Sequence, residues 1–340
     1  MPLIANPVVM DFMERSLDRV GVPANEAREI AEVILDSELR GKPDHGLYFF
    51  RFMITWLQDR TMNPAPTTTI TKDSALSTTV DSDNGCGVIG MNIATEMSIV
   101  KAKQIGMSAA AVTNSANVIT LGPFVQRAAE EGLIAFSCSA FRHPLIPPTN
   151  GLTGKFGTNP IAYAFPAGRH VPFVLDMATS GIAAAKVWEA ATNGESIPAG
   201  FVEYPDGSPL TEAVDYKLGA SLILPMSGVK GYGLAMMADL FANVLAGNDW
   251  GHFLWLINPE EFQPMSEYLD TMDGELDRIK TSKKKPGVDE IFYPGERGQR
   301  KMAELLEKGA VPLGETAWNA MQSIADELSV EMPVPIELPG

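Results

Sequence analysis

The stretch DNGCGVIGMNIATEMSIVKAKQIGM, residues 83–107, decides how the chain folds. It contains Gly85, Gly87 and Gly90 in the spacing G-x-G-x-x-G, which is the glycine pattern of dinucleotide-binding Rossmann units. Such a unit also needs a strand before the glycines, a helix after them and an acidic residue about 20 positions further on. A helix is expected after the glycines, and residues 77–80 (STTV) can form the strand.

The acidic residue of a Rossmann unit is missing. The next expected strand, residues 107–115 (MSAAAVTNS), ends without an Asp or Glu that could hold a ribose hydroxyl. Residues 7–60 also read as helical, and a simple Rossmann domain does not begin in that way. We therefore favour a helix entrance at which the glycines permit close backbone packing, and we keep phosphate binding as the alternative.

Charge and length limit the function classes. The 340 residues suffice for one large domain or two ordinary ones. The net charge of −16, from 42 acidic and 26 basic residues, repels phosphate backbones and anionic membranes, so we expect no nucleic-acid or membrane partner. The basic run KTSKKK, residues 280–285, predicts a solvated loop or, alternatively, an anchor for an anionic cofactor group.

Cysteine usage and the N-terminus indicate a cytoplasmic protein. Cys86 and Cys138 cannot build a disulfide framework, neither lies in a C-x-x-C pair, and we expect no metal site. The N-terminal segment carries acidic residues and lacks the pattern of a secretory signal. No apolar stretch reaches the roughly 18 residues that a membrane helix requires.

Hydrophobic patterning predicts an α+β fold. Residues 65–82 are rich in Thr, Val and Ile, residues 150–230 hold short β-type runs between glycines and prolines, and a long apolar helix is expected at 229–247. We predict an N-terminal helical part, 1–75, that packs with 245–340. The strand-rich part between them is expected to span 76–244.

Several motifs, taken in chain order, resemble one family. They are Asp44-His45-Gly46, Asn114-Ser115, Gly157-Thr158-Asn159-Pro160, LDMATS at 175–180, KGYGLA at 230–235 and Pro294-Gly295-Glu296-Arg297. From about residue 7 to 330, the chain resembles the malate/L-lactate dehydrogenase family of non-Rossmann oxidoreductases. The resemblance implies a homodimer that binds NAD or NADP on a largely antiparallel central sheet, with its N- and C-terminal helices packed together. It also implies a small-molecule substrate.

The resemblance assigns the acid–base role to His45, whose imidazole can give and take a proton near neutrality because its usual pKa is about 6.5. Asp44 stands where the family usually has serine, and a neighbouring carboxylate could stabilise the imidazolium. The alternative is a histidine at a helix entrance beside a capping aspartate.

The resemblance also predicts the residues around the cofactor. They are Ser115, Gly157, Thr158, Asn159, Asp176, Met177, Ala178, Thr179, Ser180, Lys230, Gly231, Pro294, Gly295 and Glu296. Thr158 and Lys230 are candidates for substrate contact as well. The alternatives are an ordinary β-turn at 157–160, helix capping by Thr179 and Ser180, a solvated Lys230 and a plain turn at 294–296.

Two departures from the family pattern fall on the substrate side. Asn117 stands where members usually carry a second histidine, and Phe49 stands where they carry an arginine that binds the substrate carboxylate. Loss of that arginine removes an interaction of about 1.5–3 kcal/mol. Arg51 does not substitute, because two positions along a helix turn the side chain by about 200°. We expect Arg142 and His143 to line the substrate site instead.

The leading interpretation is an NAD(P)-dependent oxidoreductase. Its substrate is expected to be an atypical, bulky or aromatic, 2-oxo, 2-hydroxy or cyclic imino acid. One alternative is an enzyme on the same scaffold with lyase, isomerase or hydrolase chemistry, and another is a non-catalytic ligand-binding protein. The choice between NAD and NADP stays open.

Overall fold

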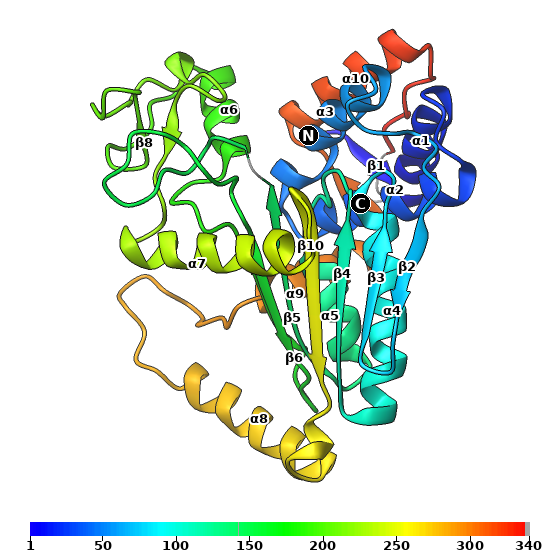
Figure 1. The fold of residues 1–340 in the computed structure, drawn as a ribbon. Helices are drawn as coiled ribbons and strands as arrows, with labels where there is room; N and C mark the ends of the chain where they lie inside the picture. Colours follow the sequence, from blue (N-terminus) through cyan, green and yellow to red (C-terminus); the bar gives the residue numbers. More distant parts are fainter. Residues whose placement is uncertain (142, 337–340) are drawn as a thin grey trace.

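A seven-stranded sheet forms the centre of the protein in the computed structural model, which describes residues 1–141 and 143–336 (Figure 1). In sheet order the strands are β2 (Thr69–Asp73), β3 (Ser77–Asp81), β4 (Met107–Thr113), β10 (Trp250–Ile257), β5 (Ile134–Phe141), β6 (Ile161–Phe165) and β7 (Phe173–Met177). Within this sheet the β3–β4 pair is parallel and the other pairs are antiparallel. The expected α+β fold with a largely antiparallel sheet is confirmed.

Helices cover both faces of the sheet because its strands alternate apolar side chains between two cores. Val112 and Leu254 join the larger core with α4 (Gly87–Ile105) and α5 (Gly122–Glu130). Phe136 and Phe253 point to the other face, where α7 (Val229–Asp239) and its π-helical continuation, Leu240–Leu245, pack. Figure 1 shows α7 crossing in front of the sheet.

The two ends of the chain lie together. Strand β1 (Leu3–Ala5) pairs antiparallel with β11 (Ala310–Pro312). Helices α1 (Asn6–Arg19), α2 (Ala24–Leu39) and α3 (Leu47–Gln58) pack with α9 (Glu296–Lys308) and α10 (Glu315–Leu328). The packing of the terminal helices is therefore confirmed. The part boundaries near 75 and 244 stay predictions, and β10, from the C-terminal part, lies in the middle of the sheet.

A small lobe and one outlying helix complete the fold. The lobe holds α6 (Ala184–Asn193), β8 (Val202–Glu203), the 3₁₀ turn Ala213–Asp215 and β9 (Leu222–Ile223), around its own apolar cluster. Helix α8 (Met265–Lys280) follows β10 and the 3₁₀ turn Pro259–Glu261, and the loop after it exposes residues 281–285. Among the described residues, no helix is long and apolar enough to cross a membrane.

The glycine-rich stretch forms a β3–α4–β4 unit whose helix entrance is closed. The N–H of Gly87, the first residue of α4, donates to the carbonyl of Asn117 at 3.0 Å. A Cβ at Gly87 would lie 2.5 Å from Nε2 of His252, and one at Gly90 would lie 2.2 Å from Oγ of Ser82. The glycines therefore permit close packing, as expected, and do not form an open phosphate loop.

Substitution at Gly85 tests this conclusion. Its Cβ would lie 2.4 Å from Cγ of Pro66, so Gly85→Ala is expected to lower the free energy of unfolding by about 1–3 kcal/mol. Urea denaturation measures the loss, and NADH titration of the folded variant should give wild-type affinity. Gly274→Ala in α8 is the control, because an added Cβ there would meet no neighbouring side chain within 4 Å. Alanine favours a helix over glycine, so the free energy of unfolding should rise by up to about 1 kcal/mol. A selective loss of cofactor affinity in Gly85→Ala, without destabilisation, would restore the phosphate-loop interpretation.

Candidate active site

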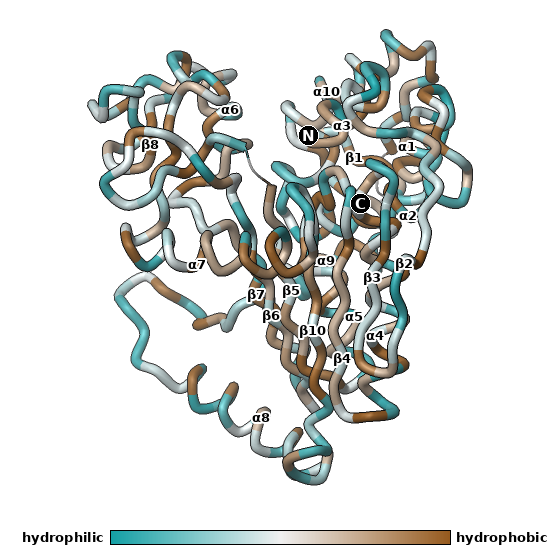
Figure 2. The backbone as a smooth tube through the Cα atoms, in the orientation of Figure 1, coloured by the Kyte–Doolittle hydropathy of each residue, from teal (hydrophilic) through white to brown (hydrophobic). Residues whose placement is uncertain are grey.

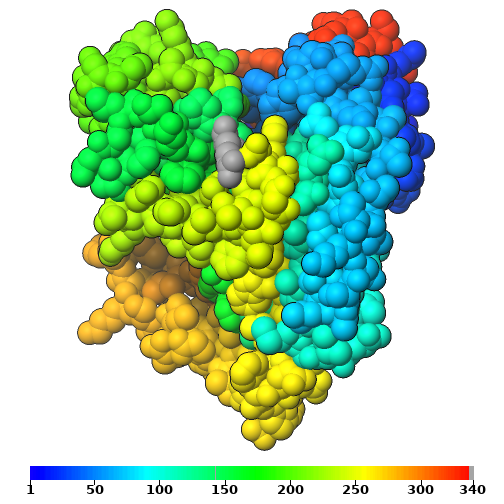
Figure 3. Space-filling view, viewed as in Figure 1, coloured from blue at the N-terminus to red at the C-terminus, as the bar shows by residue number. Residues whose placement is uncertain are grey.

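A cavity of about 650 Å³ lies between the N-terminal helices, one end of the sheet and the small lobe. Figure 3 shows the N-terminal helices, in blue, and the small lobe, in green, facing each other across a notch. Of the predicted site residues, the cavity is lined by Asp44, His45, Phe49, Asn117, His143, Thr158, Asp176, Met177 and Ala178. The fold thus brings together residues that are more than 130 positions apart.

His45 and Asp44 face each other in the cavity wall. They belong to a 3₁₀ turn, Pro43–His45, between α2 and α3, and Nδ1 of His45 lies 3.4 Å from Oδ2 of Asp44. Burial acts to raise the pKa of Asp44, but His45 and Lys186 outweigh it, so that this pKa lies below its usual value. Asp44 is therefore ionised near neutral pH and can stabilise a protonated His45.

Glu38 holds the turn that carries His45. Its Oε2 accepts a hydrogen bond from the N–H of Leu47, the first residue of α3, at 3.0 Å. Gly46 leaves the room for this contact, since a Cβ there would lie 2.0 Å from the same oxygen. Burial raises the pKa of Glu38. The buried carboxyl thereby directs the chain from His45 into α3.

Aromatic side chains form the wall beside His45. The Phe49 ring stacks on the His45 imidazole with a centroid distance of 6.4 Å and an interplanar angle of 14°. Trp56 meets the Phe49 ring edge-on at 5.6 Å, and Phe141 stacks on Trp250 at 5.1 Å. Because these rings line the cavity, position 49, where the resemblance led us to expect an arginine, is part of a surface that suits a flat apolar group.

Two lysines that the sequence interpretation missed supply positive charge to the cavity. Lys42 is partly exposed, and its Nζ lies 3.9 Å from Oδ2 of Asp176. Lys186, near the start of α6, is exposed and also lines the cavity. Lys42 could have been found, because it stands only three residues before His45. Burial lowers the pKa of His143, which lines the same wall, and Arg142 lies outside the described residues.

Asp176 lines the cavity and also accepts a hydrogen bond from the N-terminus of α5. Its Oδ2 accepts hydrogen bonds from the Thr120 hydroxyl and, at 2.9 Å, from the N–H of Gly122, the first residue of α5. Asn159 and Thr179 are buried behind the wall. The Asn159 amide donates to the carbonyl of Ala235 at 2.9 Å, and the Thr179 hydroxyl lies 3.0 Å from the Thr158 carbonyl. These two side chains hold the turn that presents Thr158 to the cavity.

The other predicted residues do not line this cavity. Gly157 packs under the Phe141 ring, Gly231 packs on Met226 and Lys230 is exposed at the start of α7. Ser115 is buried, as is Ser180, whose Oγ has no hydrogen-bond partner among the described residues. Residues 294–296 lie beside the start of β7, where the Pro294 carbonyl accepts from the N–H of Val174 at 3.1 Å. Cofactor contact by all of these residues stays a prediction.

Asn117 shapes the loop that closes α4. Its Oδ1 accepts from the N–H of Ile119 at 2.6 Å, and its backbone carbonyl accepts from Gly87. An amide cannot carry a proton as an imidazole can. His45 is therefore left as the acid–base candidate at the family positions.

His252 is a buried histidine to which the sequence interpretation assigned no role. It lies on β10, fully buried, with Nδ1 at 2.8 Å from Oγ of Ser139 and Nε2 at 3.0 Å from Oγ of Ser115. Burial lowers its pKa to about 4. A single histidine within the apolar segment WGHFLWLI offers no pattern that would reveal these partners.

The cavity has the size of a small-molecule site. Its volume of about 650 Å³ lies within the usual range for small-molecule sites, and its lining combines aromatic side chains with Thr158 and Ser139. Among the described residues, no group of three or more His, Cys, Asp or Glu side chains is placed to hold a metal ion.

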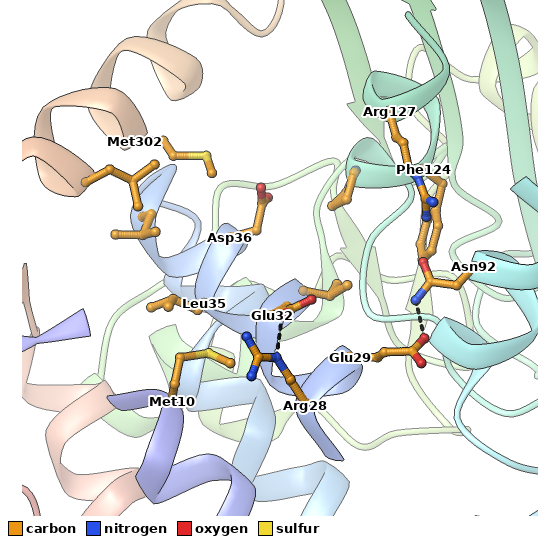
Figure 4. Close-up of a pocket in the computed structure, with 14 residues that line it drawn as sticks. Met10, Arg28, Glu29, Glu32, Leu35, Asp36, Asn92, Phe124, Arg127 and Met302 are labelled. Carbon is orange, nitrogen blue, oxygen red and sulfur yellow. Dashed lines mark hydrogen bonds and ion pairs between the residues drawn. The ribbon is translucent and has the colours of Figure 1, made fainter. Parts of the chain in front are cut away.

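A second cavity, of about 470 Å³, lies between α1, α2, α5 and α9 (Figure 4). Four of its polar side chains pair with one another. The Asn92 amide donates to Glu29 at 2.6 Å, and Arg28 pairs with Glu32 at 3.1 Å. No described residue predicted for catalysis lines it, so we place the chemistry in the cavity of His45.

The sequence relatives that share this fold form a class of dehydrogenases and reductases. Within it, the chain belongs to the malate/L-lactate dehydrogenase family, whose sequence model matches residues 4–322. It is 30% identical to a malate dehydrogenase of Pyrococcus abyssi, over 95% of this chain and 94% of the relative. It is 32% identical to a Delta(1)-pyrroline-2-carboxylate/Delta(1)-piperideine-2-carboxylate reductase of Pseudomonas putida, over 73% of this chain and 71% of the relative.

Solved structures agree with this assignment. The sulfolactate dehydrogenase of Methanocaldococcus jannaschii superposes with a TM-score of 0.81 at 30% identity, over 96% of this chain and 98% of that one. The expected family and fold are thus confirmed. Dehydrogenases of this family use nicotinamide cofactors, which supports an oxidoreductase.

The buried His252 predicts a pH dependence of stability. Its pKa is about 4 in the folded protein and about 6.5 in the unfolded chain, which therefore binds the proton first as the pH falls. Wild-type stability is expected to drop by about 3 kcal/mol between pH 6.5 and pH 4 from this group. Urea unfolding across that range measures the loss, and His252→Gln should show a correspondingly flatter profile. Parallel profiles for the two proteins would contradict the assignment.

Proposed function

We propose that the protein is an NAD(P)-dependent dehydrogenase or reductase of a 2-oxo, 2-hydroxy or cyclic imino acid with a bulky apolar or aromatic substituent. One observation carries this proposal. A histidine, His45, lies beside an ionised aspartate in the wall of a cavity that has aromatic side chains and two lysines in its lining. The enzymes named above act on malate, sulfolactate and cyclic imino acids, which supports the substrate class.

The cofactor and the side chains of the cavity have separate roles in the proposed reaction. The bound nicotinamide supplies or accepts the hydride. During reduction His45 gives a proton to the oxygen of a 2-oxo acid, or to the ring nitrogen of an imino acid before hydride transfer, and Asp44 stabilises its imidazolium before that proton is given. Lys42 and Lys186 attract the substrate carboxylate, and Phe49 with Trp56 contacts the substituent.

We also propose a homodimer formed through α7 and its π-helical continuation. A helix that is apolar all round is usually buried, but here Met236, Leu240, Val244 and Leu245 remain 43–65% exposed. Figure 2 shows this hydrophobic segment passing in front of the sheet. A second copy of the chain would cover the exposed side chains.

Substitution of His45 tests the acid–base role. A general acid contributes about 10²–10⁴-fold, so His45→Gln should lower kcat by that order. NADH affinity, measured by calorimetry, should stay within about twofold, because glutamine preserves bulk and hydrogen bonding. His170→Gln is the control, since that histidine pairs with Asp277 at 2.8 Å on α8, away from the cavity. Full activity of His45→Gln would contradict the assignment of His45 as the general acid.

Substitution of Lys42 tests how the carboxylate is held. Lys42→Met keeps the length and loses the charge, so KM for the acid should rise about 10- to 100-fold with a smaller effect on kcat. The exposed Lys72 of β2, which does not line the cavity, supplies the matched control Lys72→Met. An unchanged KM in Lys42→Met would show that other groups bind the carboxylate.

Substitution on α7 tests the dimer. Leu240→Glu places a charge on the exposed apolar face, so light scattering should give the mass of one chain, against two for wild type. Leu306→Glu changes an exposed leucine on α9 and should leave the mass at two chains. A wild-type protein with the mass of one chain at tens of micromolar would refute the proposal.

A further inference from the structure

Ser139 and His252 form a cross-strand pair at the inner wall of the cavity. The register of β5 and β10 sets them opposite each other, next to the stacked pair Phe141 and Trp250. Ser139 lines the cavity and is only 5% exposed, whereas His252 lies behind it and is fully buried. The Ser139 hydroxyl bonds to His252, so a ligand in the cavity can use only the hydrogen-bonding capacity that this bond leaves free.

The partners of His252 define its tautomer. Nε2 lies 3.3 Å from the carbonyl oxygen of Ala116, which can only accept a hydrogen bond. The Ser115 hydroxyl donates to that same carbonyl at 3.2 Å, so its oxygen is free to accept from Nε2 as well. With the proton on Nδ1 instead, the lone pair of Nε2 would face a carbonyl lone pair. The Ala116 carbonyl therefore favours the tautomer with the proton on Nε2.

The tautomer determines the polarity of Ser139. With the proton on Nε2 and the imidazole neutral, Nδ1 carries a lone pair and can only accept. The Ser139 hydroxyl, 2.8 Å away, must then donate its one hydrogen to Nδ1. Its oxygen is left with lone pairs alone for the cavity. Burial favours the neutral imidazole that this arrangement needs, since it lowers the pKa of His252.

We propose that Ser139 is a specificity-determining residue whose oxygen accepts a hydrogen bond from an N–H group of the bound ligand, and that His252 is the positioning residue that enforces this polarity. The inference rests on the proposed function. Two ligands of that function carry such a group: the carboxamide of the nicotinamide, and the ring nitrogen of a protonated cyclic imino acid. A 2-oxo acid offers none.

The cofactor arm of the test compares NADH with reduced 3-acetylpyridine adenine dinucleotide, in which a methyl ketone replaces the carboxamide and its N–H groups. If the carboxamide is the donor, Ser139→Ala should weaken NADH binding about 5- to 10-fold, as calorimetry measures. Binding of the analogue should change less than about twofold. Ser139→Thr keeps the hydroxyl and should recover much of the NADH affinity.

The matched control is Ser137→Ala. Ser137 lies two residues earlier on β5, is fully buried and donates to the carbonyl of Phe253 at 2.9 Å, but it does not line the cavity. Thermal unfolding of both alanine variants reports the loss of a buried hydrogen bond. Only Ser139→Ala should also discriminate between the two dinucleotides.

The substrate arm compares Δ1-piperideine-2-carboxylate with phenylpyruvate. If the imino acid is the donor, Ser139→Ala should raise its KM about 5- to 10-fold and leave that of phenylpyruvate unchanged. An effect in either arm supports the proposal and identifies the source of the N–H group. Equal effects on donor and non-donor ligands, or no effect in either arm, overturn it.

The tautomer of His252 can be measured directly in the folded wild-type protein. Nitrogen-15 NMR of the labelled imidazoles should show His252 neutral with the proton on Nε2, and its signals are identified by their loss in His252→Gln. If that variant does not fold, single substitutions of His45, His143 and His170 identify the remaining signal. A proton on Nδ1 overturns the polarity. If the wild type binds neither NADH nor NADPH, the proposed function itself fails. If the wild type binds a cofactor and Ser139→Ala changes nothing in either arm, only this inference is refuted.

Discussion

The tight closure of the N-terminus of α4 is the constraint on which the rest of the structure depends. In a Rossmann unit the same end of the helix stays open and its N–H groups meet a phosphate. Here Gly87 donates to Asn117, and its Cα packs against the imidazole of His252. That N–H is therefore not available to a phosphate, and the parallel β3–α4–β4 unit serves as scaffold. The cofactor site that we propose is the cavity over the same end of the sheet.

The pairing of the chain ends places the reacting group over that cavity. Strands β1 and β11 hold the termini together, and α10 packs on α3, whose first turn follows His45. The buried carboxyl of Glu38 then fixes how the chain enters α3. Stability and chemistry are therefore linked, since the interactions that fold the N-terminal helices also orient His45 toward the sheet. Behind the sheet end, a neutral His252 sets the polarity of Ser139 in a similar way.

Much of this could be predicted from the sequence, and the exceptions have physical reasons. The GTNP, LDMATS and KGYGLA motifs led to the right family and fold, and the missing acid after β4 led to the right view of the glycines. The lysines of the cavity were missed because nothing in the local pattern shows that residues 42 and 186 approach one space. His252 was missed because its partners come from β5 and from the loop after β4. Cofactor contact by Lys230 and residues 294–296, which the resemblance implies, stays a prediction, since these residues do not line the cavity.

The central claim is that a nicotinamide cofactor binds in the tryptophan-lined cavity of His45. Trp56, Trp188 and Trp250 line it, so energy transfer from tryptophan to NADH tests binding, and the change in transfer when a lining tryptophan is replaced tests location. Titration of the folded protein with NADH and NADPH should give saturable quenching of tryptophan emission and sensitised nicotinamide emission for at least one of them. Replacing Trp188 by Phe should reduce the transfer. Calorimetric binding without energy transfer would place the cofactor elsewhere, and no binding of either dinucleotide at about millimolar concentration, weaker than ordinary enzyme sites, would contradict the account.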